Sequence, residues 1–397
     1  MAVAAHIKEM MASSSFIRKM FETGNEMKAA YGAANVFDFS LGNPSAAPPR
    51  EFQDSLERTV AGDYPGKYKY MPNAGYPDVR RKLAGWISKE YGAEIGEDAV
   101  LMTAGAGGAL NTALKTLCNP GDQVLVSAPL FMEYRFYAAN HGCELKIVDT
   151  LPGFELDLDG IERAINEKTA VYLLNSPNNP SGKVYSGESL AGLADILERK
   201  SREYGRRIYL LSDEPYRRIV YGDVKVPSVF RLYRHSAVAT SFSKELSIPG
   251  ERIGWLAVHP EAEDAKNIFG GFVLCNRILG YVNAPGIMQK AIAPVLDARV
   301  DMSVYTRNRD ILCRGLKDIG YDLYEPDGTF YLFPKAPGDD GDEMKIVDAL
   351  QRQKVLVVPG RGFGSPGFFR ISFCADSETV GRSIPLFKAA FNEVAGH

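Results

Sequence analysis

Seven short apolar runs, separated by amphipathic segments, constrain the fold of this chain more than any other feature. Runs that are apolar throughout are typical of strands buried on both faces, and helical segments such as 186–204 supply the cover. We therefore expect an α/β fold, whose large domain holds a mostly parallel seven-stranded sheet sandwiched by helices. The runs are AVLMT (99–103), QVLVSA (123–128), LKIVDT (145–150), AVYLLN (170–175), RIYLLS (207–212), AVATSF (237–242) and RIGWLAV (252–258).

The pattern changes after Pro285. A long helical stretch, about 286–318, is followed by shorter strands and helices up to the C-terminus, which indicates a second, smaller α+β domain. A length of 397 residues also exceeds what one compact core usually holds. We predict a large domain of residues 48–290 and a small domain of residues 1–47 and 291–397, with the N-terminal helix packed on the small domain.

Composition argues against several classes of function. The 46 basic and 49 acidic residues are spread along the chain, so no arm for nucleic acid is visible. No stretch reaches the ~18 apolar residues of a membrane helix, and charged residues interrupt the apolar N-terminal segment where a signal peptide would lie. The five cysteines form no C-x-x-C pair and the five histidines lack metal-ligand spacing. We expect a cytoplasmic enzyme that uses no metal and binds neither nucleic acid nor membrane.

Ligands of open α/β sheets bind beyond the carboxyl ends of the strands, so the residues that follow each predicted strand are the candidates for chemistry. Lys244 follows such a strand, next to Ser241 and Ser243. Burial lowers the pKa of a lysine, and a neutral amine forms Schiff bases. Asp213 also ends a buried strand, where a carboxylate must be paired or bound to a ligand.

Three further strand ends carry weaker signals. The turn Gly105-Ala106-Gly107 opens a helix and suits a phosphate, although Leu110 breaks the dinucleotide pattern and a close-packed turn would look the same. Phe131 would stack on a flat ring or pack in the core. Asn179 lies in the dense turn 175–182 and is a candidate hydrogen-bond donor to a ligand.

Together these groups describe one ligand, pyridoxal phosphate. Lys244 would meet its aldehyde, Asp213 its ring nitrogen, Phe131 its ring face, and Asn179 and Tyr216 its ring oxygen. The groups assigned to its phosphate are Gly105, Ala106, Gly107, Ser241, Ser243 and Arg252.

At this point the sequence resembles the class I/II aminotransferases of fold type I, the family that includes aspartate aminotransferase. The stretch SFSKELSIPGERIG (241–254) matches the lysine site of that family at each constrained position, and the resemblance covers roughly residues 35–397. The other motifs come in the same order as in the family: LGNP (41–44), YMPNAGYP (70–77), NNPSG (178–182), DEPY (213–216) and FRISF (369–373).

The resemblance implies a role for each residue. Lys244 would hold the cofactor as an internal aldimine and carry the substrate's α-proton, with Asp213 and Tyr216 as the other catalytic residues. Arg370, together with Gly42 and Asn179, would bind the substrate α-carboxylate.

The resemblance also implies a reaction and a partner. The amino group of an L-amino acid would pass to a 2-oxo acid, with 2-oxoglutarate as the expected acceptor, by a ping-pong mechanism. Tyr70 matches a tyrosine that reaches the phosphate of the neighbouring subunit, which implies a homodimer with shared active sites. Leu279 aligns with the arginine of dicarboxylate-specific relatives, with Arg277 offset, which leaves aspartate and broader or aromatic donors open.

Two alternatives remain at this level. A β-eliminating C–S lyase on the same cofactor begins with the same proton abstraction, so the motifs do not separate it from a transaminase. A ligand-sensing regulator of related fold would need a DNA-binding domain, whereas only about forty residues, without a basic recognition helix, precede Gly42.

Overall fold

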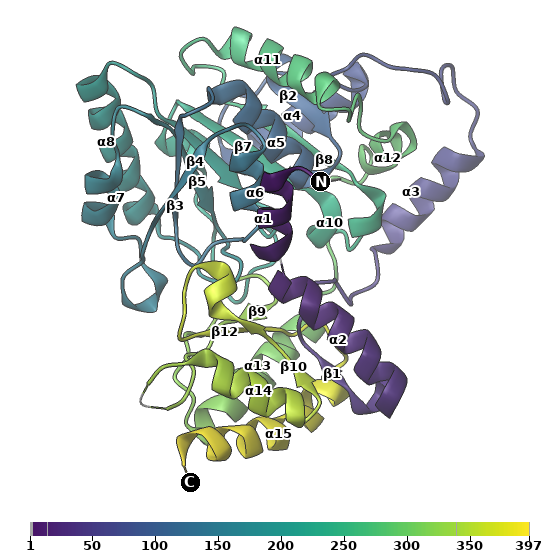
Figure 1. The fold of residues 1–397 in the computed structure, drawn as a ribbon. Helices are drawn as coiled ribbons and strands as arrows, with labels where there is room; N and C mark the ends of the chain where they lie inside the picture. Colours follow the sequence, from purple (N-terminus) through teal and green to yellow (C-terminus); the bar gives the residue numbers. More distant parts are fainter. Residues whose placement is uncertain (1–2, 14, 339, 397) are drawn as a thin grey trace.

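The computed structural model describes residues 3–13, 15–338 and 340–396, and its largest element is a mixed seven-stranded sheet (Figure 1). Every neighbouring pair of strands is parallel except the two pairs that involve β8, which is antiparallel to both of its neighbours. The predicted α/β class and the mostly parallel seven-stranded sheet are therefore confirmed. The spatial order is β2 (Val100–Thr103), β8 (Gly254–Val258), β7 (Ser236–Ser241), β6 (Tyr209–Asp213), β5 (Thr169–Asn175), β3 (Gln123–Ser127) and β4 (Glu144–Val148).

Helices flank this sheet because their apolar faces cover its strands, most of which are buried; the edge strand β4 is the exception, since only Val148 in it is buried. All seven residues of β5 are buried, as its unbroken apolar run predicts. Helix α8 begins after Ser186, whose side chain accepts from the Ser189 N–H, and ends at Gly205 in the left-handed region. The helices of this part are α3 (Arg50–Ala61), α4 (Pro77–Tyr91), α5 (Gly105–Leu117), α6 (Tyr134–Ala139), α7 (Leu158–Ala164), α8 (Gly187–Tyr204), α9 (Val229–Leu232), α10 (Phe242–Glu245), α11 (Ala265–Ile278) and α12 (Gly286–Ile292).

A second hydrophobic core lies below the first in Figure 1 and contains Phe39, Phe330 and Phe387. Its small sheets pair β1 with β10 in parallel, and β12 with both β11 and β9 in antiparallel fashion. Its elements are α2 (Ser15–Tyr31), β1 (Phe37–Asp38), α13 (Ser303–Ile319), β9 (Tyr331–Leu332), α14 (Glu343–Arg352), β10 (Val355–Leu356), β11 (Val358–Pro359), β12 (Phe369–Ser372) and α15 (Ser377–Ala395). Helix α1 (Ala5–Ser13) comes before them and in Figure 1 lies higher, at the level of α6 and the large sheet.

The long helix expected at 286–318 is wrong in one respect, because two helices, α12 and α13, occupy the stretch. The chain leaves the first helix shortly before Pro294, whose ring removes a backbone N–H and cannot continue the helical ladder. Leu296 still packs in the first core, while Val300 packs in the second. The division of the chain at residues 47/48 and 290/291 stays a prediction.

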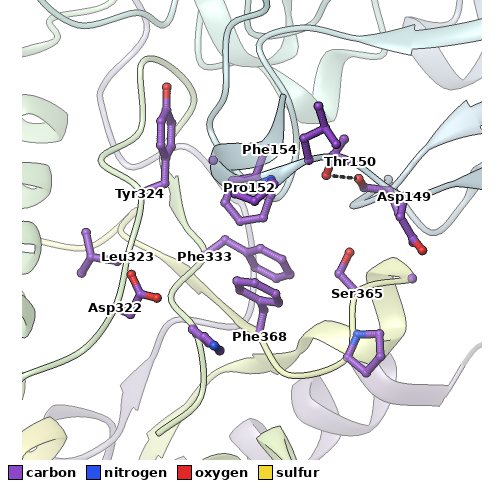
Figure 2. A pocket seen from close by; sticks show the side chains of 16 residues that line it. Asp149, Thr150, Pro152, Phe154, Asp322, Leu323, Tyr324, Phe333, Ser365 and Phe368 are labelled. Carbon is purple, nitrogen blue, oxygen red and sulfur yellow. Dashed lines mark hydrogen bonds between the residues drawn. The ribbon is translucent and has the colours of Figure 1, made fainter. Parts of the chain in front are cut away.

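An aromatic cluster joins the two cores. Phe154 comes from the large sheet's side and meets Phe333 and Phe368, which stack with ring centres 5.3 Å apart (Figure 2). A cavity of about 740 Å³ opens beside these rings, with Asp149 and Asp322 at its edges. None of the strand-end residues singled out from the sequence lines this cavity, so its chemistry is separate from theirs.

Candidate active site

A second cavity, of about 330 Å³, lies at the carboxyl ends of the parallel strands and gathers most of the predicted site residues. Two of the predicted residues are not in its wall. Gly105 lies directly before Ala106, which is in the wall, whereas the side chain of Tyr70 is 94% exposed. The predicted residues that line the cavity are Gly42, Ala106, Gly107, Phe131, Asn179, Asp213, Tyr216, Ser241, Ser243, Lys244, Arg252 and Arg370.

Lys244 lies on α10, the single helical turn that follows β7. Its Nζ donates to the Gly42 carbonyl oxygen at 2.7 Å and lies 5.5 Å from the centre of the Phe330 ring. The pKa of Lys244 is lowered to about 8, mainly by burial; the charges of Arg370 and Arg252 contribute to the shift, and Cys374 opposes it. The amine therefore exchanges its proton close to neutral pH, as a group that forms Schiff bases and transfers protons must.

Asp213 is the last residue of β6 and is 4% exposed. Its Oδ2 accepts from the Tyr134 hydroxyl at 2.6 Å, while Oδ1 is buried and has no hydrogen-bond partner in the described part of the chain. Burial raises the pKa of Asp213 to about 7, although the Tyr134 hydrogen bond opposes this shift. A buried carboxylate oxygen in this state fits a ligand N–H, such as a protonated pyridine nitrogen.

The opposite end of the cavity is built for an anion. Helix α5 starts at Gly105 with φ +77°, and a Cβ there would lie 2.8 Å from the Arg252 guanidinium. Arg252 donates to the Pro249 carbonyl at 3.0 Å and, among the residues that the structure describes, forms no ion pair with a carboxylate. A helix N-terminus, an arginine without an acidic partner and the hydroxyls of Ser241 and Ser243 together fit a phosphate.

Arg370 lies on β12 and is 3% exposed. Its guanidinium donates to Asn179 Oδ1 at 3.1 Å and to the Ser40 carbonyl at 2.7 Å. The rings of Tyr331 and Phe363 lie 4.5 and 4.8 Å from it. Its Nε has no hydrogen-bond partner within residues 3–13, 15–338 and 340–396, so a buried cation is left able to receive a carboxylate.

Several residues of the site carried no signal in the sequence. The Tyr331 hydroxyl is 2.9 Å from that of Tyr216, and a Cβ on Gly42 would lie 1.7 Å from it. Tyr134, which holds Asp213, is 79 residues away from it in the chain. Leu41, Leu110, Tyr137 and Asn175 also line the cavity.

Asn175 ties two of the predicted residues together. It lies beside Asp213 in the pairing of β5 with β6, and its side-chain amide donates to the Asp213 carbonyl at 2.9 Å. Its Oδ1 accepts from the Asn179 backbone N–H at 2.8 Å. A side chain at the end of a strand therefore fixes the turn that presents Asn179, a signal that alternation of apolar residues alone does not contain.

The chemistry of the donor set fits pyridoxal phosphate. The anion cradle, the lysine and the buried carboxylate belong to one cavity, where the cofactor has its phosphate, aldehyde and ring nitrogen. Phe131 is in the same wall and meets Tyr134 edge-on at 5.5 Å between ring centres, so a flat ring would find an aromatic neighbour there.

Two other features bear on the alternatives. Among the described residues, no group of three histidine, cysteine or acidic side chains is arranged to hold a metal ion. No helix in the described ranges is long and apolar enough to cross a bilayer.

Comparison with known proteins gives one consistent result. The family described as aminotransferase class I and II matches residues 34–384. A probable aspartate/prephenate aminotransferase of Aquifex aeolicus is 31% identical, over 91% of this chain and 92% of that protein. A probable aspartate aminotransferase of Methanocaldococcus jannaschii is 29% identical over 90% and 94%.

Solved structures agree with the sequence relatives. A crystal structure of an amino transferase from Eubacterium rectale superposes with a TM-score of 0.95 at 38% identity, covering 99% of both chains. The aspartate aminotransferase of Thermotoga maritima gives a TM-score of 0.85 at 27% identity, covering 97% of this chain and 99% of that one. With its motifs, fold and site in agreement, the chain belongs to the class I and II aminotransferase family, and it is a transaminase that depends on pyridoxal phosphate.

Proposed function

We propose that this transaminase moves the amino group of an L-amino acid to a 2-oxo acid, with 2-oxoglutarate as acceptor, in a ping-pong cycle. Lys244 would hold the aldehyde form of the cofactor before the amino donor binds. The observation that supports this most directly is that Lys244, Asp213 and Arg370 line one cavity, although they come from three different elements.

Each end of the cofactor would meet a different group. Arg252, Ser241, Ser243 and the first turn of α5 hold the phosphate, and the partnerless oxygen of Asp213 accepts from the ring nitrogen. Pyridoxal phosphate, when bound, supplies the electron sink that stabilises negative charge at the substrate α-carbon.

Tyr216 and Asn179 hydrogen-bond the phenolic oxygen. The Oδ1 of Asn179 is already engaged by Arg370, which leaves its N–H₂ group for this contact. Lys244 takes the substrate α-proton and returns it, a task for which a pKa of about 8 is suited.

Arg370 binds the substrate α-carboxylate, because its buried guanidinium holds two protein acceptors and still has an Nε without one. A planar guanidinium grips a carboxylate with two parallel hydrogen bonds, which fixes the direction of the Cα–H bond relative to Lys244. Gly42 lies beside both residues and offers its backbone to the same carboxylate.

The active form would be a homodimer, with Tyr70 of each protomer reaching the phosphate of the other site. In the single chain the Tyr70 ring is almost fully exposed, as are parts of Leu274 and Ile278 on α11. Exposed aromatic and aliphatic side chains of this size are more readily explained by a subunit contact than by solvent.

The amino donor is open between aspartate, which the names of the relatives suggest, and an aromatic or broader donor. Among the described residues, the arginines that line the cavity are Arg252 and Arg370, which are already assigned to the phosphate and to the α-carboxylate. Arg277 is exposed at the end of α11 and Leu279 follows it, so a side-chain carboxylate would need a cation from the partner protomer.

A spectral titration of the purified protein with a panel of amino acids tests the proposal. We expect the Schiff-base absorbance to disappear with true donors and to return on addition of 2-oxoglutarate. Lys244→Ala should keep the cofactor but not turn over, whereas the control Lys168→Ala, a change at an exposed loop residue, should behave as wild type. Release of pyruvate and ammonia from cysteine conjugates, without conversion of the cofactor to its pyridoxamine form, would instead identify a C–S lyase.

A further inference from the structure

Two cysteines meet at the end of α5 that faces away from the active site. Cys118 directly follows the helix and Cys143 directly precedes β4. The Gly121 N–H donates to the Gly142 carbonyl at 2.8 Å, and the Cys143 thiol contacts the Asn119 carbonyl at 3.9 Å. These contacts hold the two segments together and bring the Cys143 thiol next to the residue that follows Cys118, close enough for each thiol to shift the pKa of the other.

The surroundings favour one thiolate in this pair. The interaction with Cys118 lowers the pKa of Cys143, and it raises the pKa of Cys118 itself. The Arg206 guanidinium, which pairs with Asp122, lowers both pKa values by its charge, while the Asp122 carboxylate opposes it. A thiolate beside a second thiol and an arginine is the arrangement of reactive dithiols.

Access is also sufficient for a small oxidant. Cys118 is partly exposed, and Cys143 is buried with 9% of its surface still exposed. The other thiols are placed differently. Cys313 is 4% exposed, and burial raises its pKa to about 12; burial does the same for Cys374. The paired thiols should therefore react before these two.

We propose that Cys118 and Cys143 form a site of reversible oxidation, at which a hydroperoxide converts the dithiol to an intramolecular disulfide. The Cys143 thiolate attacks the peroxide, which breaks the O–O bond and gives a sulfenic acid and hydroxide. The Cys118 sulfur then attacks the sulfenic sulfur, the S–S bond forms, and the oxygen leaves as water. The peroxide is reduced by two electrons and the two thiols are oxidised by the same number.

The bond would close a loop that contains β3 and α6 and would tie the end of α5 to the edge strand β4. A disulfide that closes this loop restricts the conformations of the unfolded chain and so stabilises the folded protein. The first turn of α5, which lines the active site, lies about 20 Å away along the thirteen-residue helix, at about 1.5 Å per residue. The proposal is independent of the amino donor and of the catalytic cycle.

The test treats the holoenzyme with hydrogen peroxide, blocks remaining thiols with iodoacetamide, and measures intact mass and tryptic peptides. We expect the loss of two hydrogen atoms per chain, a fall from five alkylated thiols to three, and a peptide that joins Cys118 to Cys143. Dithiothreitol should restore five thiols. The oxidised protein should unfold at a higher urea concentration than the reduced one.

Matched variants separate this site from general thiol oxidation. Cys118→Ser and Cys143→Ser should each lose the bridged peptide, while Cys313→Ser should keep it. The peptide map of the wild-type protein tests the proposal even if a variant fails to fold. A bridge between other cysteines, disulfides only between chains, or irreversible sulfinic acid without a bridge would each overturn the proposal.

Discussion

Replacing Asp213 with asparagine should stabilise the cofactor-free protein and, at the same time, weaken its hold on the cofactor. The carboxyl group is 4% exposed and one of its oxygens has no hydrogen-bond partner in the described chain, so its charge is costly until a ligand arrives. An asparagine keeps the shape of the side chain and an oxygen that can accept from Tyr134, but it carries no charge.

The magnitude follows from the pKa of Asp213, which burial raises from 3.8 to about 7. At about 1.36 kcal/mol per unit, ionisation of this group costs the folded state about 4 kcal/mol. A raised carboxyl pKa means that the folded state keeps a proton that the unfolded state has released. The stability of the cofactor-free protein therefore falls as the pH rises from about 4 to about 7, and it stays at the lower value above that range.

Asp213→Asn does not lose stability in this way, because its side chain does not ionise. Above about pH 7, Asp213→Asn should be more stable than wild type by about 3 kcal/mol, after allowing about 1 kcal/mol for a weaker hydrogen bond from Tyr134. In the holoenzyme the sign should reverse, because the carboxylate–pyridinium pair proposed for Asp213 would be lost. Losing one member of such a pair costs about 2–5 kcal/mol, so the dissociation constant of the cofactor should rise about 30-fold to several thousand-fold.

The assay is urea unfolding of both cofactor-free proteins across this pH range, together with titration of each with pyridoxal phosphate. Glu245 is also buried with its pKa raised to about 7, so wild type and variant share its contribution and only their difference counts. Glu245→Gln is the matched control, since it should flatten the pH dependence while its side chain is outside the cavity wall. An Asp213→Asn protein with the wild-type pH slope, or with lower stability above neutral pH, would refute the reasoning.

Three further outcomes are expected. The rate at which the cofactor-free protein forms its Schiff base should rise about tenfold per pH unit and level off near pH 8, because only the neutral form of Lys244 reacts. Stopped-flow absorbance measures this rate, and a rate that levels off only near the ordinary lysine pKa of 10.5 would contradict the prediction. Arg370→Gln should lower kcat/KM about 30-fold or more, since about 2–5 kcal/mol of buried charge pairing is lost; loss of less than about threefold in steady-state assays would argue against carboxylate binding there. Gly42→Ala should lower the free energy of unfolding in urea by about 1–3 kcal/mol, because the new Cβ meets the Tyr331 hydroxyl. Adding Tyr331→Phe should restore part of that loss; if the Gly42→Ala loss is the same with and without Tyr331→Phe, the clash is not its cause.

The sheet could be predicted because burial on both faces leaves an apolar run in most of its strands, with the edge strand β4 as the exception. The strand-end residues could be predicted for a related reason. Carboxyl ends of parallel strands meet at one edge, so Asp213 and Lys244 had to approach each other whatever the loops between them did. The same reasoning applies to Asn175, because the register of β5 against β6 puts it beside Asp213.

The small sheets could not be predicted in the same detail. Strand β9 has two residues, and its pairing partner, β12, comes from a segment far away in the chain. Nothing in the local pattern around Tyr331 tells which residue it faces, although its hydroxyl bonds to Tyr216 and its ring covers Arg370. The role of Tyr134 could not be predicted for the same reason, since its hydrogen-bond partner Asp213 lies in another strand–helix unit.

The cations of the site explain how binding could prepare the base. Arg370 and Arg252 both lower the pKa of Lys244 by their charge, in addition to its burial. A carboxylate bound to Arg370 and a phosphate bound to Arg252 would cancel these two effects, and the affinity of Lys244 for a proton would rise. The pKa of Lys244 is thus held below its ordinary value while the site is open, and it would rise once substrate and cofactor are in place. Since each anion would act on Lys244 through an arginine of this chain, carboxylate recognition and proton transfer would be coupled in the proposed cycle.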